Sequence, residues 1–244
     1  MNNRKRTIIA AIFTAIVLIS MGLFSFFKKS ALRAQPLIEP YKEQSTNLIY
    51  NGLSCDNLSL YKENVKQPYK YPFDILFSEE NSNVDLQKIT SDITSEPRIK
   101  LLAYNKLAAN GYKSSNKELL GVIVEIGLEN GLDVLASFKN GTARYINFSE
   151  KIIIWENTTD EIVNQITKAL FANGLNIVNQ IEPQKDSRKR PPAKGNARIS
   201  FLVSDGIYFV EGSKNTFFRD PNIKSTFDKA AELMQCLINK RSSK

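Results

Sequence analysis

Histidine is absent from this chain of 244 residues, and cysteine occurs only twice. Without histidine the sequence cannot build a Ser-His-Asp or Cys-His nucleophilic site, nor a zinc or di-iron centre rich in histidine. The phosphate-binding loop GxxxxGK(S/T), the dinucleotide-binding turn GxGxxG and the GxSxG turn of α/β-hydrolases are also missing. These absences exclude the commonest enzyme classes, while chemistry based on carboxylates or on a Ser-Lys pair stays open.

The distribution of charge argues against a specific nucleic-acid partner, although the formal net charge is +8. Positions 4 to 33 hold six of the 33 lysine and arginine residues and no acidic residue, which leaves 27 basic against 25 acidic residues from Ala34 onward. The net charge of that remainder is only +2, too small for an electrostatic footprint on DNA or RNA. The basic residues near the N-terminus instead suit anionic lipid head groups.

A long uncharged run lies near the N-terminus, from Thr7 to Phe27. Its 21 residues are enough to cross a hydrocarbon layer of about 30 Å as a helix. A cleaved signal peptide, the alternative, has a shorter apolar stretch of about 7–15 residues before its cleavage site, whereas Lys28 and Lys29 follow this run at once. We therefore expect a retained transmembrane helix over 7–27.

The flanks of this run predict the topology and the domain layout. Three basic residues lie on each side, so the positive-inside rule hardly discriminates, and the very short tail of residues 1–6 favours a cytoplasmic N-terminus. Residues 28–46 are polar, contain two prolines and read as a tether, and residues 47–244 read as a single domain. The expected protein spans the cell (inner) membrane once and carries an extracytoplasmic C-terminal domain.

The two cysteines allow one disulfide, between Cys55 and Cys236, if the domain faces an oxidising compartment. The alternative is that both are buried as small hydrophobic residues, and Cys236 falls beside the apolar stripe of the last expected helix. Two distant cysteines do not form a zinc site, so neither a metal nor a cofactor is expected.

Hydrophobic periodicity predicts a helical region before residue 119, with one ambiguous stretch. Residues 47–82 fit either short strands or a wrapped loop, because prolines separate their apolar pieces. A short helix is expected around residues 84–89. A longer one is expected to have Ser95 as its N-cap and Gly111 just past its end.

Alternating apolar residues between 119 and 155 predict four strands. A helix capped by Thr158 or Thr159 should follow, continue through Gly174 and end before Pro183. The rest of the pattern predicts a loop over 183–196, a hairpin about Asp205-Gly206 and a last helix over 225–239. The expected fold is therefore α+β, in the order α-ββββ-α-ββ-α, with an antiparallel sheet (a four-strand meander plus a hairpin) packed by helices.

Two turns that contain glycine set the expected register of the meander. Asn140–Gly141 predicts a two-residue type I′ turn. Glu129–Gly131 allows a loop of two or three residues. The three-residue loop, with Gly131 left-handed, pairs Leu128 with Leu132 and keeps the apolar residues of both strands on one face. We therefore expect the three-residue loop.

Four short stretches carry a resemblance to known sequences. They are Glu118–Glu125 (ELLGVIVE), Gly131–Ala136 (GLDVLA), Gly141–Asn147 (GTARYIN), and Phe201–Gly206 (FLVSDG) with Tyr208 and Phe209. Over residues 70–240 the chain resembles an uncharacterised bacterial family of single-span, membrane-anchored proteins. The resemblance implies a bacterial membrane setting, and because the family has no assigned activity it implies no catalytic residue.

Glu125 and Asp133, both within the expected meander, are the candidates for acid or base catalysis. In the expected register Glu125 lies on the outer face of the sheet, diagonal to Arg144. The simpler interpretation is therefore a cross-strand ion pair, worth about 0.2–1 kcal/mol. Asp205 is explained by its turn, since Asp-Gly is a typical turn sequence.

Two surfaces are candidates for binding. The outer face of the sheet should hold Ile123, Leu135 and Ile146, which are either covered by a helix or available to dock another chain. The loop over 183–196, rich in proline and basic residues, can contact anionic lipid or an acidic partner, or can be a solvated connector. Its candidate residues, with the start of the next strand, are Lys185, Arg188, Lys189, Arg190, Lys194 and Arg198.

The sequence therefore predicts a membrane-tethered, non-catalytic binding or assembly module that meets a protein partner or the lipid surface. This hypothesis rests on the missing catalytic groups. One alternative is a carboxylate-dependent hydrolase that acts on cell-envelope material, and another is a structural subunit of a membrane complex. An enzyme is the less favoured interpretation.

Overall fold

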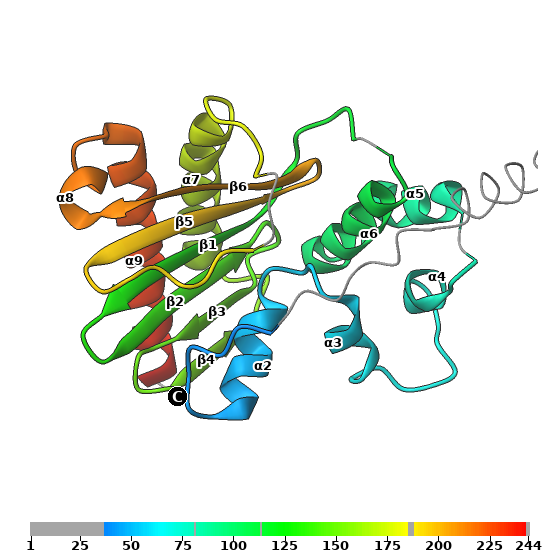
Figure 1. Cartoon of the computed structure of the whole chain (residues 1–244), viewed down its shortest axis with the longest axis horizontal. Helices are drawn as coiled ribbons and strands as arrows, with labels where there is room; N and C mark the ends of the chain where they lie inside the picture. Colours follow the sequence, from blue (N-terminus) through cyan, green and yellow to red (C-terminus); the bar gives the residue numbers. More distant parts are fainter. Residues whose placement is uncertain (1–36, 81, 113, 185–187, 243–244) are drawn as a thin grey trace, which may run out of the picture. The chain divides into compact units, whose positions relative to one another are not determined.

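The computed structural model describes residues 37–242, except 81, 113 and 185–187 (Figure 1). The expected tail (1–6), the expected transmembrane helix (7–27), residues 28–36 of the tether and Lys185 lie outside the described residues. Within residues 37–242, no helix combines the length and the apolar character that a membrane crossing needs. The described elements are α2 (Gln44–Gly52), α3 (Leu58–Lys62), α4 (Phe73–Phe77), α5 (Asn83–Ser91), α6 (Pro97–Ala109), β1 (Leu119–Leu128), β2 (Gly131–Phe138), β3 (Ala143–Ile146), β4 (Ile152–Trp155), α7 (Glu161–Val178), β5 (Asn196–Val203), β6 (Gly206–Ser213), α8 (Lys214–Phe217) and α9 (Pro221–Ser242).

The fold is α+β, with one sheet of six antiparallel strands in the order β4-β3-β2-β1-β5-β6. Strands β1 to β4 form the expected meander, and the β5–β6 hairpin joins its free side through β1. The predicted class and the predicted groups of strands are thereby confirmed. The helices α2, α3, α4 and α8 were not expected.

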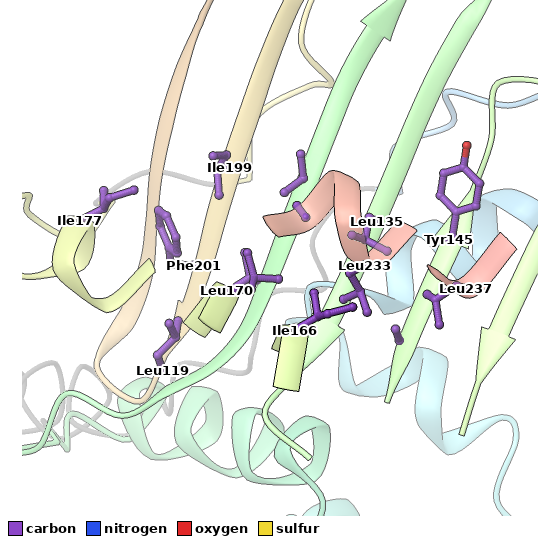
Figure 2. Packing of buried hydrophobic residues seen from close by; sticks show 14 of the residues in the cluster. Leu119, Leu135, Tyr145, Ile166, Leu170, Ile177, Ile199, Phe201, Leu233 and Leu237 are labelled. Carbon is purple, nitrogen blue, oxygen red and sulfur yellow. The ribbon is translucent and has the colours of Figure 1, made fainter. Parts of the chain in front are cut away.

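Helices cover both faces of this sheet. On one face α7, α8 and α9 enclose a hydrophobic core that includes Leu170, Phe201 and Leu233 (Figure 2). On the other face α2 and α4 to α6 enclose a second core with residues such as Leu76, Ile89 and Phe138. The meander is thus apolar on both sides, so the polarity of its side chains does not by itself select one register of its strands.

The register of β1 and β2 differs from the prediction. Leu128 pairs with Gly131, so the loop has two residues, and Val124 stands opposite Leu135. The prediction assumed that only one face of the sheet is buried. Because both faces are buried, apolar residues occupy both sides of each strand, and the rule that a slip exposes a hydrophobic face does not apply.

The turn between β2 and β3 also differs, since it has three loop residues. Phe138 N donates to Thr142 O at 2.9 Å, and Gly141 has a φ of +87°. Among the described residues other than glycine, only Cys55 and Glu150 have a positive φ, so Asn140 does not adopt the type I′ conformation. Its side chain instead accepts from Thr142 N at 3.2 Å, and this bond fixes the alternative turn.

Three predicted helix ends are shifted. Helix α6 begins at Pro97 with Glu96, not Ser95, as its N-cap. Helix α7 is capped by Asp160 rather than by a threonine, because the Asp160 carboxylate accepts from Val163 N at 3.1 Å. Helix α9 begins at Pro221, four residues before the expected start. Gly174 lies within α7 as predicted and permits close packing, since a Cβ there would lie 2.9 Å from the Phe201 ring.

Three short helices occupy residues 44–52, 58–62 and 73–77, and the domain begins earlier than residue 47. Both apolar pieces of the ambiguous stretch, Leu58–Lys62 and Phe73–Phe77, are short helices rather than strands. Tyr41, assigned to the tether, is buried, and its hydroxyl donates to Leu132 O at 3.1 Å. The tether therefore extends no further than residue 37, because Ile38 exchanges two hydrogen bonds with Asn51 and packs against the core.

Candidate functional site

Glu125 of β1 is buried on the sheet face that α2 covers, with 5% of its surface exposed. The Tyr50 hydroxyl of α2 donates to its Oε1 at 2.6 Å, and Arg198 Nη1 of β5 lies 3.4 Å from its Oε2. The prediction that Glu125 pairs with Arg144 is wrong. In the actual register Arg198 stands directly opposite Glu125, whereas Arg144 pairs with Ala136 in the ladder and forms its ion pair with Glu156.

Arg198 is a strand residue whose guanidinium joins two carboxylates to the basic loop. Its Nε donates to Glu211 Oε2 at 3.0 Å, in addition to the contact with Glu125. Its Nη2 donates to Arg190 O at 2.5 Å, and its Nη1 reaches Lys189 O at 3.4 Å. Arg198 thus neutralises two acidic side chains and holds the backbone of the loop, so it is not available to a partner.

The described part of the loop that leads into β5 makes several contacts with the domain, although many of its side chains are exposed. The Arg188 guanidinium lies 4.6 Å from the Tyr50 ring centre, and the Lys189 ammonium lies 4.5 Å from that of Phe209. Lys194 forms an ion pair with Glu129. Gly195 N also donates to Gly127 O at 2.9 Å. Of the described candidates, Arg188 and Arg198 are therefore engaged within the molecule, whereas Lys189, Arg190 and Lys194 stay exposed at the surface.

This charged cluster borders a cavity of about 110 Å³. The lining includes Tyr50, Glu125, Arg188, Arg198 and Ser200. Burial, and then the neighbouring Glu125 carboxylate, raise the pKa of Tyr50, so this hydroxyl keeps its proton and remains a donor. Small-molecule sites typically measure about 300–1,000 Å³, so the cavity is too small for a saccharide or a peptide.

Asp133, the second candidate carboxylate, lies on the opposite face of the sheet from Glu125. Tyr145 OH donates to its Oδ2 at 3.2 Å, and Phe148 N donates to its Oδ1 at 2.7 Å. Burial, and then Asp133, raise the pKa of Tyr145 to about 12. Because the sheet separates the two carboxylates, they cannot act together on one substrate.

The remaining candidates from the sequence are buried or separated. Ile123, Leu135 and Ile146 are at most 5% exposed, and Leu135 lies in a different core from the other two, so they form no docking surface. Cys55 and Cys236 are free thiols, and the predicted disulfide is wrong. Cys55 belongs to the core on one face of the sheet and Cys236 to that on the other.

A larger groove, absent from the sequence analysis, opens between α2, α3 and strands β2 to β4. Its volume is about 540 Å³. We call it the arginine groove, because Arg98 of α6 and Arg144 of β3 lie in its lining beside Phe138. At its mouth Leu48 is 42% and Ile154 is 55% exposed. The other apolar side chains of its walls are Ile49, Leu53, Leu60 and Val65.

The two arginines of this groove are held rigidly. Arg144 is 7% exposed, and its Nη1 donates to Ala143 O at 2.8 Å. The Arg98 guanidinium lies 5.5 Å from the Phe138 ring centre, and its Nη2 lies 3.0 Å from Glu96. Burial, and then the nearby Arg98, lower the pKa of Arg144. The one sequence signal for this site was an arginine in the middle of an apolar strand.

No family model matches this chain, and no curated protein or solved structure matches it either. The resemblance to an uncharacterised bacterial family therefore stays a prediction, and the functional argument rests on the geometry of the domain.

Proposed function

We propose that this chain is a membrane-tethered, non-catalytic binding module whose binding site is the arginine groove. The observation that carries the proposal is the groove itself. It is large enough for a small molecule, it is walled by apolar side chains, and it contains two fixed cationic groups. Few convergent polar groups in an apolar pocket are typical of a ligand site.

The carboxylates support binding rather than hydrolysis. Glu125 is occupied by Tyr50 and Arg198 at the wall of a small cavity, and Asp133 accepts two internal hydrogen bonds on the other face. Asp133 does border a cleft of about 350 Å³, but Tyr145 and Phe148 N already bond to its two oxygens, so it is not poised as the acid or base that a carboxylate-dependent hydrolase of cell-envelope material needs. We therefore favour the binding module over the hydrolase.

The tether is the second part of the proposal. The uncharged run over 7–27 supports a retained span with an extracytoplasmic domain in the cell (inner) membrane. Because Ile38 is bonded to Asn51 in the domain, the link is residues 28–37. About 10 residues reach at most ~36 Å when extended. The domain would then stay close to the lipid surface.

Crosslinking within cells tests the module. The full-length chain carries a photoreactive amino acid at Leu48 or Ile154, at the groove mouth, or at Ile162, which is 58% exposed on α7. We expect discrete adducts from the two groove positions and none of them from Ile162. The same adducts from all three positions, or none from the groove, would overturn the binding site.

Alkaline extraction tests the tether separately. Full-length chain should stay in the membrane pellet at high pH, and a variant with two arginines placed within 7–27 should be released. Release of the unaltered chain would overturn the retained span without bearing on the groove.

A further inference from the structure

The charges around the arginine groove are arranged unevenly. The acidic partners of Arg98 and Arg144 are Glu96 and Glu156, whose side chains are 53% and 52% exposed. Neither glutamate is among the residues that line the groove. The two guanidinium groups thus have acidic partners on their solvent side, while the groove lining itself holds two arginines and one acidic residue.

One nitrogen in the groove wall also lacks an acceptor. Arg98 Nε is buried and has no hydrogen-bond partner among the described residues. This nitrogen is itself out of reach of a ligand in the open groove, so an anion would contact the accessible part of the Arg98 side chain, which is 21% exposed, and a charged acceptor is the strongest partner for a guanidinium. The acidic side chain in the groove lining is Glu63, an exposed residue of the segment after α3. The groove therefore favours an anion.

The walls determine what the anion must be attached to. Leucine, isoleucine and valine side chains from α2, α3, β4 and the segment after α3 face the same space, with the arginines at one part of it. A peptide would need a partner for a backbone amide and carbonyl at each residue, and β4, at the edge of the described sheet, could supply such partners along one side of the groove only. A hydrocarbon chain makes no such demand and gains free energy from the apolar walls.

We propose that the arginine groove binds a single-chain amphiphile, with its anionic head, a carboxylate or a phosphate monoester, at Arg98 and Arg144. Its hydrocarbon chain lies against α2, α3 and β4 and leaves the groove between Leu48 and Ile154. This inference rests on the proposed function and names the ligand class of the same site. The short link to the membrane would keep such a ligand within reach.

Photolabelling of the full-length chain in membranes tests the ligand class. Three probes share one diazirine-bearing hydrocarbon chain: a fatty acid, a lysophosphatidic acid and the uncharged fatty alcohol. Labelled peptides are quantified by mass spectrometry, and labelling of the run over 7–27 corrects for partition into lipid. At least one anionic probe should label peptides of α2 and α3 about tenfold more than the alcohol does, because only a charged head gains the strong bonds to arginine.

Matched variants locate the site. Leu48→Glu puts a negative charge at the exposed groove mouth, and Arg98→Gln removes one cation. Each should lower labelling by the anionic probe to the level of the alcohol. Ile162→Glu, an equally exposed position on α7, should not change labelling. Glu63→Gln should leave labelling equal or increase it.

Each outcome bears on one proposal. Greater labelling by the fatty acid or by the lysophosphatidic acid supports the inference and identifies the head group. Equal labelling by alcohol and anions overturns the ligand class, while groove crosslinks from Leu48 and Ile154 would still support the binding module. A protein adduct at these positions without excess anionic labelling assigns the groove to a polypeptide and also overturns the inference.

Discussion

Replacing Arg198 with methionine should destabilise the domain strongly. The Arg198 side chain is 6% exposed, and its partners Glu125 and Glu211 are 6% and 28% exposed. The substitution leaves the Glu125 carboxylate in a buried site with Tyr50 as its remaining partner. It also removes the bonds that hold the loop backbone at Arg190.

The expected loss of free energy of unfolding follows from the burial of this ion pair. Removing one partner of a buried ion pair costs about 3–5 kcal/mol. For a domain of this size 1 kcal/mol shifts the melting temperature by about 2–4 °C. Arg198→Met should therefore melt about 6–20 °C below the unaltered protein.

Trp155, the single tryptophan, reports the unfolding of the sheet edge by its fluorescence. Lys224→Met serves as the control, because the pair of Lys224 with Asp228 on α9 is half-exposed on both sides. Such surface pairs contribute about 0–1 kcal/mol. The Lys224 variant should therefore melt close to the unaltered protein.

A double variant isolates the pair itself. Glu125→Gln removes the negative charge and keeps an oxygen that can accept from Tyr50. The double variant with Arg198→Met should lose less free energy of unfolding than the two single variants lose together, by about 0.5–3 kcal/mol. A melting temperature of Arg198→Met within about 2 °C of the unaltered protein, or strictly additive losses, would refute a buried structural role for this pair.

Three further predictions concern the loop, the thiols and alkaline pH. Gly127→Ala should push the basic loop off β1, because the new Cβ would lie 2.3 Å from Ala193 O; limited trypsin digestion should then cut the loop faster, and an unchanged rate would contradict this. A thiol reagent should modify half-buried Cys236 in the native protein and buried Cys55 only after unfolding, for a total of two thiols; fewer than two would indicate a disulfide. Burial raises the pKa of Cys55 and of Tyr145 to about 12 in the fold, from about 9 and 10 when unfolded. The contribution of these two protonated groups to the free energy of unfolding is complete below about pH 9 and falls as pH rises toward 12. Melting temperatures between pH 8 and pH 11.5 should decline accordingly, and a flat profile would contradict this.

The sheet could be predicted because its signals are local. Alternation and glycine turns located all six strands, and the apolar period through Gly174 located α7. The register of β1 and β2 could not be predicted from the same alternation. It depends on whether one or both faces are covered, and that is decided by helices distant in sequence.

The site was harder to predict because its parts are far apart in the chain. Tyr50 and Glu125 are 75 residues apart, and no spacing rule connects them. Arg198 was grouped with the basic loop as a binding candidate, since sequence alone did not show that β5 lies beside β1. The arginine groove was missed because α2, α3 and the segment after α3 form part of its walls. Most of this region falls in residues 47–82, which the prolines made ambiguous.

Native mass spectrometry of the full-length chain, extracted gently from the membranes of the cells that produce it, tests the central claim most directly. The account predicts that the unaltered protein retains an adduct with the mass of a single-chain anionic amphiphile, and that Leu48→Glu lacks it. A bare unaltered protein, or the same adduct in equal amount on both proteins, would contradict the assignment of the arginine groove as the binding site.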